Sequence, residues 1–335
     1  MQLDTDSLIL AIDTSCDDTS AAVIRNGRSV LSSIVYGQGE IHSLYGGVVP
    51  EAASRRHTEM IWPTVQLAME KSNTEFSQLS AIAVCSGPGL IGCLIVGTSF
   101  AKALAYASNL PLIGVNHLEG HVCSVFLTHE SVFPHISLVI SGGHTSLYLV
   151  QSMGAYEEIG RTRDDAAGEA YDKVAKMLGL GYPGGPIIDN LAKTGDPKAV
   201  NFPRALIKGT LDFSFSGLKT SVRNYLLHNQ NISTEDVCAS FQAAVTDTII
   251  TKLLWAAETH GINTLSVSGG VAANEGLRQR LQTLKNMRVL LPPKEHCTDN
   301  AAMIGLVGDY YFKQGAVSDL TLNPKACLSI TANCG

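Results

Sequence analysis

Residues 8–24 read LILAIDTSCDDTSAAVI, an apolar run, a polar turn and a second apolar run. Two short apolar runs that flank a turn predict two buried strands joined as a hairpin. The pattern returns in residues 136–150, ISLVISGGHTSLYLV, about 128 residues later when Asp13 is matched with Ser141. The repeat predicts an internally duplicated chain in which each half opens with a strand hairpin.

After each hairpin the chain holds helical sequence and then another apolar strand that ends in glycine. The first, Ile82-Ala83-Val84-Cys85, runs into Ser86-Gly87-Pro88-Gly89, and the second, Leu265-Ser266-Val267-Ser268, runs into Gly269-Gly270. Each half is therefore predicted to be an α/β unit with a mixed sheet. Surface loops are expected at residues 183–186 (PGGP) and 194–209. Helices are expected at residues 58–71, 98–107, 169–178, 234–259, 274–284 and 300–314.

The length and composition favour two lobes of similar size. The 335 residues are 45% hydrophobic and 16% charged, which is enough for two cores. We place one lobe at residues 1–130 plus 300–335 and the other at residues 131–299. The eight cysteines form no C-x-x-C pair, no apolar run is long enough to span a bilayer, and the N-terminus is acidic, so a cytoplasmic protein is expected. The net charge of −6 gives no global attraction to RNA, so an RNA contact requires a local basic patch or a partner.

Four predicted strand ends carry small or acidic residues. They are the turns at residues 13–19, 86–89, 141–145 and 268–270. Glycine removes the Cβ and lets backbone N–H groups approach a phosphate, and a following helix N-terminus adds a favourable dipole. One such turn is most simply a tight turn. Four at matched positions predict a nucleotide site in a cleft between the lobes.

A histidine pair indicates a metal site. The stretch His117-Leu118-Glu119-Gly120-His121 puts two imidazoles four residues apart, on one face of a helix. The alternative is a pair of hydrogen-bonded polar histidines, and Gly120 is a poor helix former. Asp299, at the start of an expected helix, is the best acidic third ligand by context. Two histidines and one carboxylate leave open positions for a substrate.

Three common enzyme motifs are absent from the sequence. In an H-E-x-x-H protease the glutamate follows the first histidine directly, whereas Glu119 comes two residues after His117 and would face away from the metal. The sequence also has no G-x-x-x-x-G-K-[ST] loop and no G-x-S-x-G turn. Zincin, P-loop and α/β-hydrolase functions are therefore disfavoured.

An acidic run at residues 164–173 enters one of the expected helices. Asp164 and Asp165 suit a helix N-terminus, where carboxylates favour the dipole. Asp172 lies a turn inside the helix and is not expected to act as a cap. Together with Asp189 and the glycines at 184 and 185, it is predicted to contact hydroxyl or amine groups of a ligand.

The assembled motifs resemble the TsaD or Gcp family of tRNA N6-adenosine threonylcarbamoyltransferases, in its bacterial and mitochondrial branch. The resemblance implies an α/β fold made of duplicated ribonuclease-H-like domains of the actin, sugar-kinase and Hsp70-like (ASKHA) type, with an interlobe cleft. Further stretches that carry it are Tyr45-Gly46-Gly47-Val48-Val49-Pro50-Glu51, Phe213-Ser214-Phe215-Ser216-Gly217-Leu218-Lys219-Thr220, Ser268-Gly269-Gly270-Val271-Ala272-Ala273-Asn274 and Cys297-Thr298-Asp299-Asn300-Ala301.

The resemblance also implies specific site residues. One divalent ion per subunit, Fe2+ or Zn2+, would be bound by His117, His121 and Asp299. The catalytic base is not identified by the resemblance, and Asp13 and Asp17 are candidates only; Asp13 stands where many bacterial members have glutamate. The residues implied to hold threonylcarbamoyl-AMP, or an AMP- or ATP-type nucleotide, in the cleft are Val139, Ile140, Ser141, Gly142, Gly143, Asp172, Gly185, Asp189 and Asn274.

The implied reaction transfers the threonylcarbamoyl group to N6 of the adenosine next to the anticodon in tRNAs that read ANN codons, and it releases AMP. The implied partners are tRNA and a TsaC-type synthase that supplies the adenylate, together with TsaB-like and TsaE-like subunits in a bacterial member or none of these subunits in a mitochondrial one. A second copy of the chain is a further option, and no membrane is implied. Two other classes stay open: an ASKHA-type ATPase or kinase, and a non-catalytic nucleotide-binding scaffold subunit. The ATPase or kinase would not require the histidine pair, and the scaffold would tolerate loss of Asp299.

Overall fold

The computed structural model describes residues 6–205, 207, 209–229, 231 and 233–330, and these form two compact units. Unit 1 comprises the described residues of Met1–Ile41, Val48–Glu130 and Asp299–Gly335, and unit 2 those of His42–Gly47 and Ser131–Thr298. Two boundaries differ from the lobes expected from the sequence. Residues 42–47 belong to unit 2, where Gly46 lies against the Lys176 side chain. Asp299 belongs to unit 1, where its carboxylate meets two histidines.

Unit 1 is built on a five-stranded mixed sheet in the order β3-β2-β1-β4-β5. Strand β1 pairs antiparallel with β2 and parallel with β4, as predicted for a hairpin followed by a crossover. The strands are β1 (Leu8–Asp13), β2 (Thr19–Arg25), β3 (Ser29–Tyr36), β4 (Ala81–Gly87) and β5 (Leu112–Asn116).

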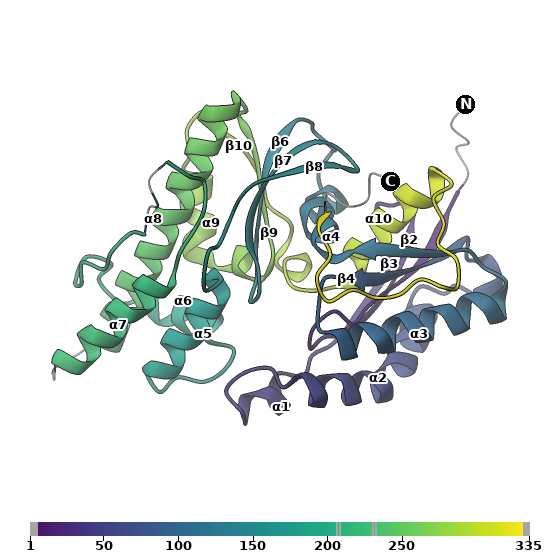
Figure 1. Cartoon of the computed structure of the whole chain (residues 1–335), viewed down its shortest axis with the longest axis horizontal. Coiled ribbons are helices and arrows are strands. Elements are labelled where there is room, and N and C mark those ends of the chain that lie inside the picture. Colours follow the sequence, from purple (N-terminus) through teal and green to yellow (C-terminus); the bar gives the residue numbers. More distant parts are fainter. Residues whose placement is uncertain (1–5, 206, 208, 230, 232, 331–335) are drawn as a thin grey trace. The chain divides into compact units, whose positions relative to one another are not determined.

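Helices cover both faces of this sheet, which explains why β1 reads as a continuous apolar run. Leu10 and Ile12 point into the cluster formed with α2 (Pro50–Lys71) and α3 (Ile91–Ser108). The opposite face meets α10 (Ala301–Lys313), whose Gly305 backbone approaches the side chains of Ile24 and Ala11. Figure 1 shows α2 and α3 side by side below the sheet. The short helices α1 (Gly39–Ser43) and α4 (His117–Cys123) complete the first half of the chain.

Unit 2 repeats the same topology and thereby confirms the predicted duplication. Its sheet has the order β10-β9-β6-β7-β8, so the central strand again pairs antiparallel with the next strand and parallel with the strand after the crossover. The strands are β6 (His135–Ile140), β7 (Thr145–Ser152), β8 (Ala155–Arg161), β9 (Thr264–Ser268) and β10 (Arg288–Leu290).

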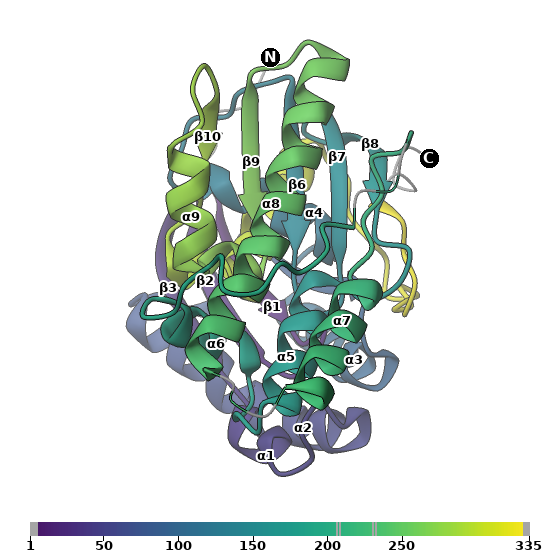
Figure 2. The same cartoon turned by 90° about the vertical axis from the view of Figure 1, so that its left-hand side faces the viewer.

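The core of unit 2 lies between this sheet and its helices. Leu138, Leu147 and Val267 of the sheet belong to one buried apolar cluster with Phe241 of the long helix α8. Figure 2 shows α8 in front of β6 and β9. The helices are α5 (Ala167–Met177), α6 (Gly184–Ala192), α7 (Ser216–His228), α8 (Thr234–His260) and α9 (Glu275–Gln282).

Three sequence predictions of local structure were wrong, and the start of α3 at Ile91 rather than at residue 98 is one of them. Residues 183–186 were expected to be a loop, but α6 starts at Gly184 and continues through Pro186, which suits the first turn of a helix. Helix α2 starts at Pro50 rather than at residue 58 and passes through Pro63 without ending. Its buried face on the sheet, which includes Ala53, Ile61 and Val65, outweighs the hydrogen bond that Pro63 cannot make.

Two helices, α3 and α8, are long and apolar enough to cross a membrane by length and composition alone. In α8, 78% of the 18-residue segment that is apolar enough is buried within the protein, as in the core helix of a soluble fold. Counting uninterrupted apolar runs missed both helices because polar residues are spread along them.

Candidate functional site

Three side chains of unit 1 meet at the start of α4. His121 Nε2 lies 3.0 Å from Asp299 Oδ1, and His117 Nε2 lies 3.5 Å from the same oxygen. The two imidazole rings are nearly perpendicular, with centroids 4.7 Å apart. The three candidate ligand atoms lie within 4.8 Å of one another, so His117, His121 and Asp299 could hold one metal ion.

The local fold explains how these residues come together. Asn116 caps α4 by accepting hydrogen bonds from the backbone N–H groups of Leu118 and Glu119, so His117 opens the helix and His121 follows one turn later. A Cβ on Gly120 would lie 3.0 Å from Met303 of α10, so glycine permits the close approach of the two helices. This packing brings in Asp299, which precedes the N-cap residue of α10.

Glu119 does not face the metal site, in agreement with the helix geometry expected from the sequence. Its carboxylate is buried and accepts from the Tyr311 hydroxyl, with both oxygens 3.0 Å away. A zincin-type arrangement is therefore ruled out by geometry at this position.

The electrostatics of the three ligands are strongly coupled. Burial alone lowers the pKa of His117, but the carboxylates of Asp299 and Asp13 raise it well above its usual value. Burial alone raises the pKa of Asp299, but His117 and His121 hold it well below its usual range. Asp299 therefore stays ionised, and the raised pKa of His117 favours a positive charge on the imidazole beside it.

The acidic turn after β1 lies beside this group. Asp13 is 1% exposed, and its Oδ2 lies 3.1 Å from His117 Nδ1. Asp17 is partly exposed on the same turn. Burial and the charges of Asp17, Asp299 and Asp13 raise the pKa of Asp18 to about 8. The turn is thus crowded with carboxylates whose repulsion a cation would relieve.

The turn at residues 86–89 was expected to contact a phosphate, but the C-terminal segment contacts it instead. Lys325 N–H donates to Ser86 O at 2.8 Å, and Gly89 N–H donates to Ala326 O at 3.1 Å. Gly87 has φ +143°, and a Cβ there would lie 2.2 Å from Lys325 O. The glycines at this strand end serve close backbone packing, a role that the sequence pattern could not separate from phosphate binding.

In unit 2, residues 139–143 form the end of β6 and the turn that follows it. Val139 and Ile140 are buried in the sheet, whereas Gly142 and Gly143 are exposed. Ser141 Oγ accepts from the backbone N–H of His144 and its carbonyl accepts from Gly168 N–H at the start of α5. The turn is therefore held in place by its own hydrogen bonds and presents glycine backbone at the surface.

Asp172 caps α6, the helix that follows its own, whereas the sequence predicted no capping role for it. Its Oδ1 accepts from Gly184 N–H at 2.8 Å, the first residue of α6. The contact was not predicted because Asp172 and Gly184 lie 12 residues apart on two different helices. Gly185 follows on α6 with open space where a Cβ would lie, and Asp189 lies one turn further along the same helix.

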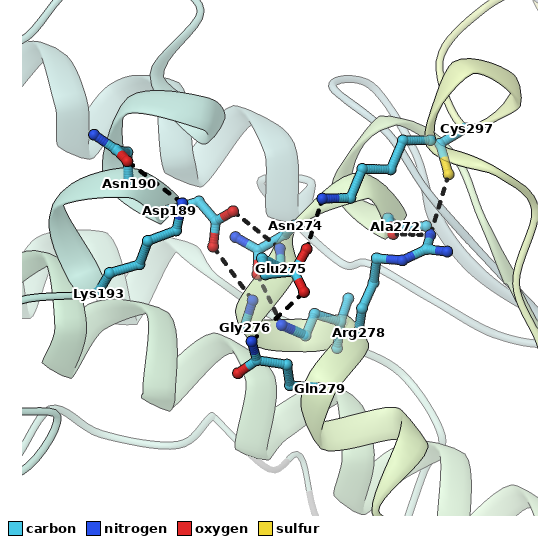
Figure 3. Close-up of polar contacts among 12 residues, drawn as sticks. Asp189, Asn190, Lys193, Ala272, Asn274, Glu275, Gly276, Arg278, Gln279 and Cys297 are labelled. Atoms are coloured by element: carbon cyan, nitrogen blue, oxygen red, sulfur yellow. Dashed lines mark hydrogen bonds and ion pairs between the residues drawn. The ribbon is translucent and has the colours of Figure 1, made fainter.

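Asp189 and Asn274 meet at the N-terminus of α9 (Figure 3). Asp189 Oδ2 accepts from Glu275 N–H at 2.9 Å, and Asn274 Oδ1 accepts from Leu277 N–H at 2.8 Å. Gln242 of α8 joins them, with Nε2 donating to Asp189 at 3.1 Å and Oε1 accepting from Asn274 at 2.6 Å. Two predicted ligand-binding residues thus share one hydrogen-bonded network.

Asp164 and Asp165 do not cap α5, which was one of the roles that the sequence left open for them. Asp164 accepts from the backbone N–H groups of Phe215 and Ser216, so it caps α7. Asp165 forms ion pairs with Lys173 and Lys219 at 2.8 and 2.6 Å. Both carboxylates therefore fasten α7 to the segment before α5.

Three residues that lie beside candidate site residues or contact the turns that carry them were not predicted from the sequence, namely Cys85, His57 and Gln242. Cys85 lies two residues before the end of β4 with its Sγ near Asp13 and His117, and burial raises the pKa of its thiol to about 12. His57 of α2 is buried and forms hydrogen bonds with Thr19 Oγ1 and Cys16 O. Strand-end position could have identified Cys85, but no pattern in α2 or α8 distinguished His57 or Gln242 from other helical residues.

Comparison with known proteins places this arrangement in a family. Residues 29–306 match the model of the TsaD family, described as tRNA N6-adenosine threonylcarbamoyltransferase. This chain belongs to the TsaD family. The relative from Thermodesulfovibrio yellowstonii is 54% identical over 96% of this chain and 100% of its own length, and the one from Clostridioides difficile is 51% identical over 97% and 99%. Both carry the name tRNA N6-adenosine threonylcarbamoyltransferase.

Solved structures confirm the predicted fold class. HypF from T. kodakarensis matches with a TM-score of 0.63 and 15% identity, covering 92% of this chain and 48% of HypF. Component A of the (R)-2-hydroxyglutaryl-CoA dehydratase from Acidaminococcus fermentans matches with a TM-score of 0.56 and 14% identity, covering 92% and 99%. At these identities the similarity establishes the ASKHA-type fold of this TsaD-family chain and nothing about its ligands.

Proposed function

We propose that this chain transfers the threonylcarbamoyl group from threonylcarbamoyl-AMP to N6 of the adenosine next to the anticodon in tRNAs that read ANN codons, with release of AMP. The main support is the full-length similarity, at about half identity, to proteins named for this reaction. The convergence of His117, His121 and Asp299 in unit 1 supplies the site that a kinase or scaffold of this fold would not need.

The three converging side chains fit a catalytic divalent ion by their chemistry. Two imidazole nitrogens and one carboxylate oxygen suit Zn2+ or Fe2+, and three protein ligands leave positions open for substrate. When bound, such an ion supplies Lewis-acid polarisation of a phosphate or carbonyl oxygen. His117 and His121 are fixed by α4 and Asp299 by the start of α10, so the protein holds the ligand set rigidly.

We assign the substrate contacts in unit 2 to the turn at residues 141–143 and to Asp172, Gly185, Asp189 and Asn274. The exposed glycine backbone of the turn suits a phosphate, because N–H groups can approach it closely. Carboxylate oxygens have more than one lone pair, so Asp172 and Asp189 can accept a ribose hydroxyl while they keep their helix contacts. The network with Gln242 limits the movement of Asp189 and Asn274.

In the transfer, the adenosine N6 amine attacks the carbamoyl carbon, and the bond from that carbon to the AMP phosphate oxygen breaks. The amine loses one proton, and AMP leaves with the electron pair of the broken bond. Asp17 is the better candidate to accept the proton, because it is partly exposed, whereas Asp13 is buried. The reaction requires no nucleophile from the protein.

Partners and location follow from the same proposal. Unit 1 exposes large apolar side chains on α2 and α3, namely Trp62, Ile91, Ile95 and Tyr106, which would suit a TsaB-like subunit or, as the alternative, a second copy of the chain. The net charge of −6 makes help with tRNA binding from TsaB-like and TsaE-like subunits reasonable. A TsaC-type synthase would supply the adenylate, and the setting would be cytoplasmic.

The test is a transfer assay with purified chain, partner subunits, threonylcarbamoyl-AMP and unmodified tRNA, followed by nucleoside analysis. The proposal expects threonylcarbamoyl-adenosine with the parent chain and none with a His117→Ala/His121→Ala variant. No modified nucleoside from the parent with all partners present would favour a scaffold. ATP hydrolysis without tRNA modification would favour an ATPase.

A further inference from the structure

Asp13 lies next to the metal-site histidine without being one of the three converging ligands. Its Oδ2 is 3.1 Å from His117 Nδ1, while Nε2 of the same ring is 3.5 Å from Asp299 Oδ1. The two nitrogens of one imidazole therefore face two different carboxylates. His121 Nε2 lies 3.0 Å from the same Asp299 oxygen that His117 Nε2 faces.

The second oxygen of Asp13 is occupied as well. The backbone N–H of Ser15 donates to Oδ1 at 2.8 Å, and Asp13 is 1% exposed. An ionised carboxylate can only accept hydrogen bonds, so the contact with His117 requires a proton on Nδ1. A proton on Nδ1 leaves the Nε2 lone pair of the neutral ring directed toward Asp299 and His121, where a metal would bind.

We propose that Asp13 is a positioning residue that holds His117 with its proton on Nδ1 and its lone pair toward the metal, and that it is not the base of the transfer. The inference rests on the metal role proposed above. Its test uses metal binding alone, so a failed transfer reaction and a failed positioning role give different results.

Asp13→Asn is the most informative substitution, because the fixed Ser15 N–H determines how the amide must turn. The amide oxygen has to face Ser15, which leaves the amide NH2 facing His117 Nδ1. Two donors cannot share that contact, so the ring is driven to the tautomer with its proton on Nε2, which blocks the metal. Loss of such an outer carboxylate typically lowers metal affinity about 10- to 100-fold.

Two matched variants separate positioning from other roles. Asp13→Glu keeps an acceptor-only carboxylate, so it is expected to recover most of the affinity lost in Asp13→Asn. Cys85, Asp13 and His117 also have candidate ligand atoms within 4.8 Å of one another. Cys85→Ser removes the thiol from this second group while Asp13 and His117 are kept. It is expected to bind metal as the parent does.

The experiment titrates the chelator-stripped full chain and each variant with Co2+ and with Zn2+, using the cobalt absorption spectrum and competition for affinity. We expect the parent and Cys85→Ser to bind metal with equal affinity and Asp13→Glu to bind almost as tightly. Asp13→Asn is expected to bind about 10- to 100-fold more weakly. Equal affinity of Asp13→Asn and parent would overturn the proposal. So would a thiolate-to-cobalt band in the parent that disappears in Cys85→Ser, because Asp13, Cys85 and His117 would then themselves bind metal.

A measurement on the parent alone keeps the proposal testable if Asp13→Asn does not fold. Long-range 1H–15N spectra of the zinc-loaded chain distinguish a protonated ring nitrogen from a metal-bound one. The proposal expects His117 with a proton on Nδ1 and metal on Nε2. The reverse assignment would refute it.

Discussion

His135 offers a sharp test of how burial controls stability in unit 2. It begins β6, is 0% exposed, and its Nδ1 lies 2.9 Å from Val132 O. Burial lowers the pKa of His135 to about 4 from a usual value of 6.5. Between these values the unfolded chain binds a proton that the folded chain does not, so the free energy of unfolding falls as the pH falls from 6.5 to 4.

The size of the effect follows from the two pKa values. The loss of stability relative to pH 7 is about 2 kcal/mol at pH 5 and about 3 kcal/mol at pH 4 by the linkage relation. His135→Leu is expected to be less stable at pH 7, because Val132 O loses its donor. Its stability should nevertheless fall less steeply with pH, by the amounts just given.

Urea unfolding at pH 7, 5 and 4 measures this difference. The chain has two tryptophans, Trp62 in unit 1 and Trp255 in unit 2, so a Trp62→Phe background makes fluorescence report on unit 2. The same change at the exposed His228 is the control and is expected to keep the parent's slope. Parallel pH profiles for His135→Leu and its parent would show that the reasoning is wrong.

Three further changes follow from contacts described above. Gly87→Ala puts a Cβ 2.2 Å from Lys325 O at a φ of +143° and is expected to cost about 2–4 kcal/mol in thermal or urea unfolding, whereas Gly39→Ala, with open space at its Cβ, should be near neutral. Asp164→Ala removes the cap of α7 and is expected to cost about 1 kcal/mol and to speed hydrogen exchange in the first turn of that helix; unchanged exchange would contradict the capping role. Zn2+ at about 100 times its Kd should stabilise the parent by about 2.7 kcal/mol, and a similar shift in His121→Ala would argue against the metal site.

Much of the fold is predictable from local sequence patterns. The apolar runs of β1 and β6 and the turns after them gave the duplication, because strands covered on both faces are apolar throughout and their polar turns stand out. The start of α6 was missed because Pro183-Gly184-Gly185-Pro186 has the composition of a turn. Its helix depends on Asp172, which supplies a cap from another helix.

The candidate metal group was visible in sequence because two of its members lie four residues apart on α4. Asp299 was predicted only from its position before an expected helix. The packing of α10 against α4 at Gly120 brings its carboxylate next to the histidines. Contacts that depend on tertiary packing could not be predicted from the sequence. Examples are the hydrogen bonds of Gln242 with Asp189 and Asn274 and the packing of the C-terminal segment on Gly87. The expected cleft between the lobes stays a prediction.

The most direct test of the account is metal-dependent transfer. The chain is stripped with chelator, assayed for tRNA modification with its partners and threonylcarbamoyl-AMP, and assayed again after addition of Fe2+ or Zn2+, with Asp299→Ala in parallel. The account predicts that activity is lost on stripping, returns at one metal ion per chain, and does not return in Asp299→Ala. Equal rates of adenosine modification with and without the metal would contradict it.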